Sequence, residues 1–263
     1  MRPTLDFLQT AQQQIHSTLE TLRPKLLAAQ GSIAHRMKDD RSPVTAMDLL
    51  VERCLRENLA RLDHAIGFGG EEGGVDYSQK TFWLVDPIDG TEPFIRGIPI
   101  AANMIALIDN NEPVMGVIYN FSTDEYFLAI KGHGATCNNR PIHVGNRPLG
   151  HAWVTLGMQS GRPGAAGLSD QLSQLVYRVR NFGNSAFDFS LIARGSIEGR
   201  IHFGGKACEW DFAPGALIVQ EAGGRVANIG SDGYDYRKLD HIAANPVIFD
   251  ELMKFMNGVV EHA

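Results

Sequence analysis

A strand that runs straight into an acidic turn is the feature of this sequence that most restricts its fold. The segment Thr81–Val85 has a strand-like, largely apolar character, and the turn DPIDGT follows it directly. Pro87 fixes its own φ and holds the residue before it extended, while Gly90 permits a backbone path that a side chain would block. A buried strand therefore delivers acidic groups to a stiff turn.

The acidic groups of this turn are spaced so that they can bind one cation. Asp86 and Asp89 lie three positions apart with the carbonyl of Ile88 between them, and such oxygens are typical ligands of hard cations. The amides of Gly90 and Thr91 are available to an anion. The hypothesis is a magnesium-and-phosphate site. Its alternative is an ordinary exit from a sheet, because Asp is a common turn former.

Two other acidic stretches fit the same site. In GGEEGG, the glycines around Glu71 and Glu72 allow a carboxylate to approach another group, and this loop can lie beside the strand that begins at Thr81. In CEWD, Asp211 stands at the start of a predicted helix over residues 211–222. Solvated glutamates and helix capping by the aspartate are the alternatives that the sequence leaves open.

The composition excludes several classes of protein. A chain of 263 residues with 44% hydrophobic content can form one large α/β domain or two lobes. Three cysteines without paired spacing argue against a disulfide framework or a zinc knuckle, and a net charge of -6 offers no basic surface to nucleic acid. Because there is no membrane-length apolar run and no signal-peptide core, we expect a cytoplasmic protein without a membrane partner.

Helical periodicity predicts two packing helices in the first part of the chain. Apolar positions over Thr4–Ala29 follow helical spacing, and Pro24 is expected to kink or divide this helix. Thr45 and Asp48 have the spacing of a capping box at the start of the second helix. Lys38, in the loop between the helices, is expected to be a solvated surface charge.

The rest of the chain predicts strands first, and then strands alternating with helices. An antiparallel meander is expected over residues 100–108, 113–119 and 125–130. The second half includes a helix over residues 169–179, with Ser169 as a plausible N-cap. We therefore expect layered α and β elements in one globular unit, with an N-terminal α+β lobe over about 1–148 and a C-terminal α/β lobe over about 149–263.

The acidic stretches together resemble the signature set of a known family. GEE at 70–72, DPIDGT at 86–91 and WD at 210–211, followed by APG and EAGG, are similar to the motifs of the inositol monophosphatase family of lithium-sensitive, Mg²⁺-dependent sugar phosphatases. Further matches are SPVTAMD at 42–48, GHGATCNNRPI in the meander, and FGNSAFDFSLIARG at 182–195. The resemblance implies a layered αβαβα fold with the active site between the lobes. Since many relatives are homodimers, it also suggests a homodimer.

The resemblance implies roles for individual residues. The family's metal ligands fall on Glu71, Asp86, the carbonyl of Ile88, Asp89 and Asp211. Asp48 and Thr91, with Thr45 nearby, fall on the dyad that assists the attacking water, and Glu71 and Asp89 share in catalysis. Phosphate and substrate contacts fall on Asp89, Gly90, Thr91, Gly183, Asn184, Ser185 and Asp211. A metal-activated water then attacks phosphorus directly, without a covalent phosphoenzyme.

The chemistry of these residues supports the same cofactor. Four carboxylates in one cleft repel one another by roughly 1 to 4 kcal/mol per close pair, so cations are needed between them. Every candidate ligand atom is an oxygen, which favours Mg²⁺, or Mn²⁺ as a substitute, over zinc. We expect about two or three ions, which would also hold the phosphate and neutralise the leaving alkoxide.

The sequence departs from the family pattern at positions that concern the substrate. Gly204 stands seven residues before Asp211, where inositol-selective relatives carry a glutamate that grips substrate hydroxyls, and Pro93 replaces the usual Asn. The run FIRGIP is also similar to members that act on histidinol phosphate or fructose 1,6-bisphosphate. The expected substrate is a small polyol or sugar phosphate, with these two esters as alternatives. A non-catalytic regulatory protein is the alternative from another class.

Overall fold

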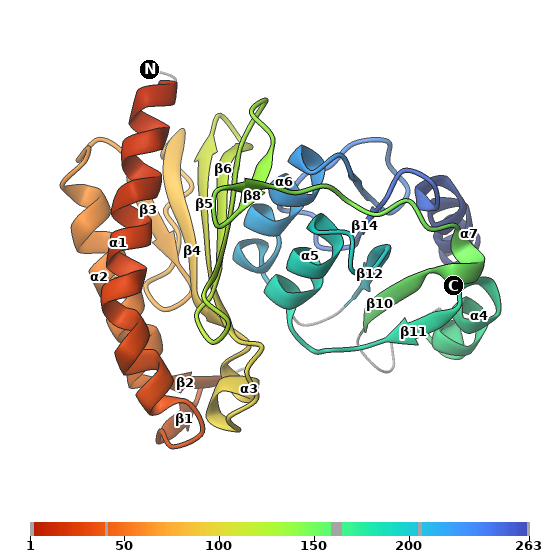
Figure 1. The fold of residues 1–263 in the computed structure, drawn as a ribbon, viewed down its shortest axis with the longest axis horizontal. Coiled ribbons are helices and arrows are strands. Elements are labelled where there is room, and N and C mark those ends of the chain that lie inside the picture. Colours follow the sequence, from red (N-terminus) through yellow and green to blue (C-terminus); the bar gives the residue numbers. More distant parts are fainter. Residues whose placement is uncertain (1–2, 40–41, 159–164, 205–206, 262–263) are drawn as a thin grey trace.

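Helices and sheets alternate through the molecule (Figure 1). The computed structural model describes residues 3–39, 42–158, 165–204 and 207–261. The layers run helix, sheet, helix, sheet, helix. Their helices are α1 (Leu5–Ala29) and α2 (Ala46–Ala60) on one outside, α5 (Ser185–Ala193) and α6 (Ala213–Glu221) in the middle, and α4 (Leu168–Leu175) and α7 (Phe249–Glu261) on the other outside. The expected αβαβα fold is confirmed.

Two sheets contain most of the strands. The seven-stranded sheet has, in spatial order, β3 (Gly67–Gly70), β4 (Thr81–Asp89), β5 (Ala102–Asp109), β6 (Glu112–Asn120), β7 (Glu125–Ile130), β8 (Ala135–Cys137) and β9 (Arg140–Pro141). The five-stranded sheet has the order β11 (Arg178–Arg180), β10 (Trp153–Met158), β12 (Gly199–Phe203), β14 (His241–Ala244) and β13 (Arg225–Asn228). A separate hairpin pairs β1 (His35–Met37) with β2 (Pro43–Thr45). Because β3 and β4 are parallel, their carboxyl ends meet at the same edge.

The first helix is continuous, so of the two expected effects of Pro24, a kink or a division, the division is wrong. α1 extends through Pro24 to Ala29. Its buried residues lie on one face on both sides of the proline, and they are Leu8, Ala11, Ile15, Thr18, Leu19, Leu22 and Leu26. This face packs against α2 and the seven-stranded sheet. Since burial of the face continues past the proline, tertiary packing outweighs the missing backbone hydrogen bond.

The antiparallel meander is confirmed as β5, β6 and β7. Asn110 and Asn111 connect β5 to β6 with φ values of 49° and 64°. Two consecutive residues with positive φ give the turn whose twist matches the flanking strands, and Asn adopts this conformation readily. The local sequence DNNE therefore determines this connection.

Two predicted helix starts differ from the structure. α4 begins at Leu168 after Gly167, whose φ is 71°, so Ser169 lies inside the first turn rather than at the N-cap. The helix predicted over 211–222 begins later, as α6 at Ala213, because Asp211 belongs to a short 3-10 turn, Glu209–Asp211. The carboxylate of Asp211 accepts a hydrogen bond from the N–H of Cys208, which closes that turn before α6 begins.

The middle helices are buried between the sheets. Every residue from Ala213 to Val219 in α6 is buried, as expected for a helix that is covered on all sides. A side chain at Gly215 would overlap the ring of Phe189 in α5, so the glycine permits close contact between the two helices. In the described ranges, no helix has both the length and the apolar character needed to cross a membrane.

We predict that Gly215→Ala destabilises the protein by roughly 1 to 3 kcal/mol, because the added methyl group overpacks the contact between α5 and α6. Gly258→Ala is the matched control, since Gly258 lies in α7 with no atom near the added Cβ. This control should stabilise the protein by roughly 0.5 to 1 kcal/mol through helix propensity. Urea unfolding at 25 °C measures both changes, and equal effects at the two positions would contradict the packing argument.

Candidate active site

The acidic turn after the apolar part of β4 brings carboxylates together. Oxygen atoms of Asp86, Asp89 and Asp211 all lie within 4.8 Å of one another. The first two residues belong to β4 and are only 2% and 9% exposed. The pairing of β4 with β5 shifts register between them, and such an irregularity re-aims side chains that would otherwise alternate across the sheet. The register shift therefore lets both aspartates join the third, which comes from the 3-10 turn before α6.

Backbone N–H groups hold each of these carboxylates. Asp86 Oδ1 accepts from the N–H of Ile88 at 3.0 Å, and Asp211 Oδ2 accepts from the N–H of Cys208 at 2.7 Å. Asp89 Oδ2 accepts from the N–H of Ala186 in the first turn of α5. The acids are therefore anchored by the fold itself, and their remaining oxygen lone pairs are available to other groups.

Burial and mutual repulsion make these carboxyl groups difficult to ionise. Burial raises the pKa of Asp86 well above its usual value, and the charges of Glu71 and Asp211 raise it further. Burial and the charge of Asp211 raise the pKa of Asp89 to about 8. Burial likewise raises the pKa of Asp211 to about 6. A site of this kind is stable in its fully charged form only when positive charge is supplied to it.

Lys38 supplies positive charge at one side of the acidic group. Its Nζ donates to Glu71 Oε1 at 2.7 Å and to Glu72 Oε1 at 2.6 Å. Burial lowers the pKa of Lys38, but the hydrogen bonds to both glutamates outweigh this effect and raise it. The expectation of a solvated surface charge is therefore wrong. The ammonium group shows that Glu71 lies where a cation is stabilised.

Asp48 and Thr91 form a buried hydrogen-bonded pair beside the aspartates. Asp48 Oδ2 accepts from the N–H and the hydroxyl of Thr45, so the predicted capping box is present. Asp48 Oδ1 lies 3.2 Å from Thr91 Oγ1, which also lies 3.0 Å from the carbonyl oxygen of Ile88. The threonine hydroxyl has a single proton and can donate it to either oxygen. The cap and the pair with Thr91 thus use the same aspartate.

Gly90 fits against the start of α5. It has a φ of 84°, and an added Cβ would overlap the side-chain amide nitrogen of Asn184. That amide donates to the carbonyl oxygen of Asp89 at 2.9 Å, while its Oδ1 accepts from the N–H of Phe187 and caps α5. The glycine-rich segment before α5 is therefore fastened to the acidic turn.

A cavity of about 230 Å³ adjoins this cluster. Asp89 and Asp211 line it together with the expected substrate contacts Gly183, Asn184 and Ser185. Arg200 and His202 of β12 also line it, and both were missed in the sequence. The alternation in RIHF could have identified them, because Ile201 and Phe203 face the opposite, apolar side of the strand.

Gly204, the position compared with the family's glutamate, lies just past the end of β12. Its φ is 68°, and its N–H donates to Asp240 Oδ1 at 2.7 Å. Among the described residues of this region, the polar side chains that line the cavity come from the preceding strand instead. Arg200 and His202 are therefore the polar groups that the described part of this region contributes to the wall.

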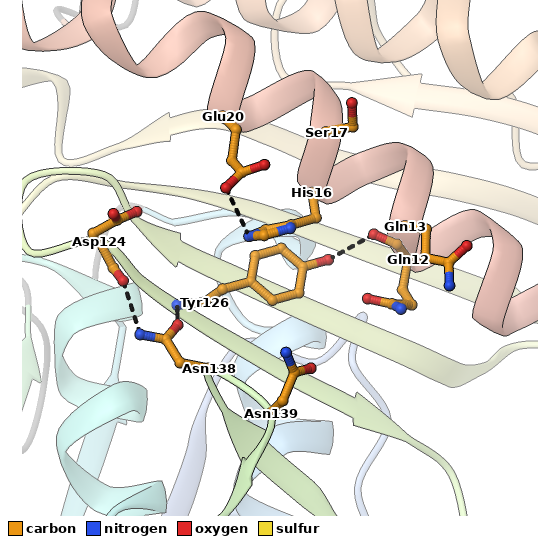
Figure 2. A pocket seen from close by; sticks show the side chains of 9 residues that line it. All are labelled: Gln12, Gln13, His16, Ser17, Glu20, Asp124, Tyr126, Asn138 and Asn139. Carbon is orange, nitrogen blue, oxygen red and sulfur yellow. Dashed lines mark hydrogen bonds and ion pairs between the residues drawn. The ribbon is translucent and has the colours of Figure 1, made fainter.

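A larger pocket of about 500 Å³ lies elsewhere, between α1 and the end of the meander (Figure 2). Its polar groups bind one another: the hydroxyl of Tyr126 donates to the carbonyl of Gln12 at 3.1 Å, and the side chain of Asn138 joins the N–H of Tyr126 to the carbonyl of Asp124. None of the clustered acids lines it. The smaller cavity is therefore the candidate active site.

Comparison with known proteins gives consistent results. The family profile described as Inositol monophosphatase family matches residues 1–260. A Nus factor SuhB of Xylella fastidiosa is 33% identical, covering 74% of this chain and 71% of the relative. A histidinol-phosphatase of Mycobacterium tuberculosis is 31% identical, covering 84% and 87%. Among solved structures, an IMPase of Thermotoga maritima superposes with a TM-score of 0.85 at 26% identity, covering 94% of this chain and 96% of that one.

We predict that Asp89→Asn raises the melting temperature in EDTA at neutral pH. Folding must either protonate the buried Asp89 carboxyl or keep it charged beside Asp211, and the neutral amide avoids both costs while it retains an oxygen for the N–H of Ala186. A gain of about 1 to 2 kcal/mol corresponds to a few degrees for a chain of this size. In Mg²⁺, the wild-type protein should be stabilised and the variant should not. The surface change Asp232→Asn is the control. A lower melting temperature for the Asp89 variant in EDTA would contradict the repulsion argument.

Proposed function

The chain belongs to the inositol monophosphatase family, and from that premise we propose that it is a Mg²⁺-dependent phosphomonoesterase acting on a small polyol or sugar phosphate. The observation that carries this proposal is the group of three aspartate oxygens within 4.8 Å of one another, two of whose residues line a cavity. Such a group has no stabilising role by itself, because its members repel. It fits a site that binds divalent cations and the phosphate that accompanies them.

The residues present fit magnesium. The side-chain donors Glu71, Asp86, Asp89 and Asp211 are all carboxylates, and the raised pKa values of the aspartates reflect an uncompensated negative site. The ammonium of Lys38 on Glu71 indicates the same demand for positive charge. These carboxylates, with the carbonyl of Ile88, would hold the ions. Bound Mg²⁺ would neutralise the phosphate, stabilise the leaving alkoxide and lower the pKa of water.

The chain's own residues orient the attacking water in this proposal. When Thr91 donates its proton to Asp48, the hydroxyl oxygen of Thr91 becomes an acceptor for a proton of that water. Burial raises the pKa of Asp48, which makes its carboxylate a stronger base, while the two bonds from Thr45 hold it in place. Glu71 is a second acceptor for the water. The attack on phosphorus is then direct.

The identity of the ester stays open between several candidates. The named activity of the histidinol-phosphatase relative supports histidinol phosphate as one alternative, and fructose 1,6-bisphosphate is the other. A regulatory role is supported by the names of the Nus factor relatives. The presence of the full acidic set favours hydrolysis. The proposal also includes a cytoplasmic location and a homodimer. It further includes binding of about two or three Mg²⁺ ions, substitution of Mg²⁺ by Mn²⁺, and inhibition by lithium.

We predict Mg²⁺-dependent phosphate release from at least one ester in a panel of inositol 1-phosphate, histidinol phosphate, fructose 1,6-bisphosphate and glycerol 2-phosphate. EDTA should abolish the release, because the carboxylates cannot bind phosphate without cations. Colorimetric assay of inorganic phosphate measures it. Failure of every ester, although Mg²⁺ raises the melting temperature, would favour the regulatory alternative.

We also predict that Thr91→Val lowers kcat by about 10²- to 10⁴-fold, because the variant cannot accept a proton from the attacking water. Stabilisation by Mg²⁺ should persist, since the carboxylates are unchanged. Thr123→Val, at an exposed turn where the hydroxyl donates to Glu125, is the matched control and should retain normal turnover. Turnover of the Thr91 variant within about threefold of the wild type would disprove the role of this hydroxyl.

A further inference from the structure

The wall of the cavity formed by β12 contains a buried arginine. Arg200 is 2% exposed, and its guanidinium lies over the rings of Phe189 and Phe212 at 4.6 and 5.2 Å from their centroids. Burial lowers the pKa of Arg200, although an arginine remains protonated under ordinary conditions. The aromatic rings hold the planar group in place but provide no hydrogen-bond acceptor in its plane. The arginine therefore needs oxygen atoms from elsewhere.

The described part of the protein supplies few of these oxygens. Nη1 and Nη2 of Arg200 each reach an oxygen of Ser185 only at 3.5 Å, and Nε has no hydrogen-bond partner among the described residues. The nearest carboxylate oxygen in an ion pair, Asp188 Oδ2, is 4.0 Å from Nη1 and already accepts from the hydroxyl of Thr155 at 2.9 Å. A buried guanidinium whose N–H groups are so weakly satisfied is unfavourable unless a ligand completes its hydrogen bonds.

Space for such a ligand lies directly in front of the arginine. Gly157 of β10 lines the same cavity, and an added Cβ there would lie 3.0 Å from His202 Nδ1 and 3.9 Å from Arg200 Nη2. The absence of a side chain at Gly157 therefore leaves space beside these nitrogen atoms. Asp89 and Asp211, where the reacting phosphate is expected, line the same cavity as Arg200. An ester whose phosphate binds beside these aspartates therefore has its alcohol part in the cavity that Arg200 lines.

We propose that the alcohol part of the substrate carries a second oxyanion, a phosphate or a carboxylate, and that Arg200 is the residue that recognises it. This inference rests on the proposed phosphatase function and specifies its substrate class. A guanidinium presents parallel N–H groups that match the oxygens of these anions better than single hydroxyl groups. His202 and Ser185 lie beside the arginine and add polar groups to the subsite.

Asp188 limits the strength of this subsite but does not close it. Burial raises the pKa of Asp188 to about 6, against the opposing effects of Arg200 and Thr155. Its charge balances that of the arginine, so recognition depends on directed N–H groups rather than on net charge. The alternative ligand for this subsite is a neutral polyol, whose hydroxyls would bind Arg200 and Asp188 together. The experiment below distinguishes it from a second oxyanion.

The experiment compares esters that differ only in the second anion. Fructose 1,6-bisphosphate is paired with fructose 1-phosphate, and 3-phosphoglycerate is paired with glycerol 1-phosphate, each in Mg²⁺. The first pair tests a second phosphate and the other pair tests a carboxylate. We call the ester with the second anion the charged member of its pair, and the ester without it the neutral partner. In the wild-type protein, kcat/KM for the charged member of at least one pair should exceed kcat/KM for its neutral partner by about tenfold or more.

The decisive variant is the double change Arg200→Gln with Asp188→Asn, which removes both charges together and leaves no lone buried ion. The ratio of kcat/KM for the charged ester to kcat/KM for the neutral ester should fall to a value between about 1 and 2, because KM for the charged ester rises. The kcat and KM of the neutral ester should stay within about threefold of the wild-type values. Arg200→Lys should retain part of the preference, and Gly157→Ala should reduce it by narrowing the subsite. Arg225→Gln, on the surface, should change nothing, and thermal melts check folding.

Equal kcat/KM for charged and neutral partners in the wild type would overturn the inference, as would a variant that lowers both equally. If none of these esters is hydrolysed, the proposed function fails for this class. Calorimetric titration with the same esters in Mg²⁺ then tests the inference by itself. Tighter binding of the charged partner, lost in the double variant, would sustain it, and equal or absent binding would refute it.

Discussion

Repulsion among buried carboxylates is the constraint on which the rest of this structure depends. Asp86, Asp89 and Asp211 come from two distant parts of the chain, yet their oxygens lie within 4.8 Å of one another. Burial and neighbouring charges raise the pKa of all three. Folding brings them together against an unfavourable electrostatic energy, which the apolar core around β4 must offset. This arrangement is typical of a functional site rather than of a stabilising one.

The middle helical layer makes this arrangement possible. The first turn of α5 donates a backbone N–H to Asp89, and its N-cap residue Asn184 binds the carbonyl of the same residue. α6 follows directly after Asp211. Both helices are packed between the two sheets (Figure 1). The acidic site is therefore assembled where the two sheets are joined, and neither sheet holds it alone.

Local rules predicted the parts of the structure that depend on neighbouring residues. The strand leading to Asp86, the capping box at Thr45 and the Asn110–Asn111 turn are set by short stretches of chain, and all are present. Tertiary contacts decided the rest. The salt bridge of Lys38 to Glu71 joins elements that are far apart in sequence, and the approach of Arg200 to the cavity depends on which face of β12 meets the middle helices. The lobe boundary near residue 148 stays a prediction.

The strand β12 has a consequence for how this chain can change over evolutionary time. The start of α5 both lines the cavity and anchors Asp89, so substitutions there would disturb the hydrolytic centre. The side chains of Arg200 and His202 line the same cavity. Among the described residues, Arg200 donates its hydrogen bonds to Ser185 rather than to the three aspartates, and it acts on Asp89 and Asp211 through its charge. After gene duplication, a copy of this chain can acquire a new substrate through these two positions while it inherits the carboxylates of the hydrolytic centre.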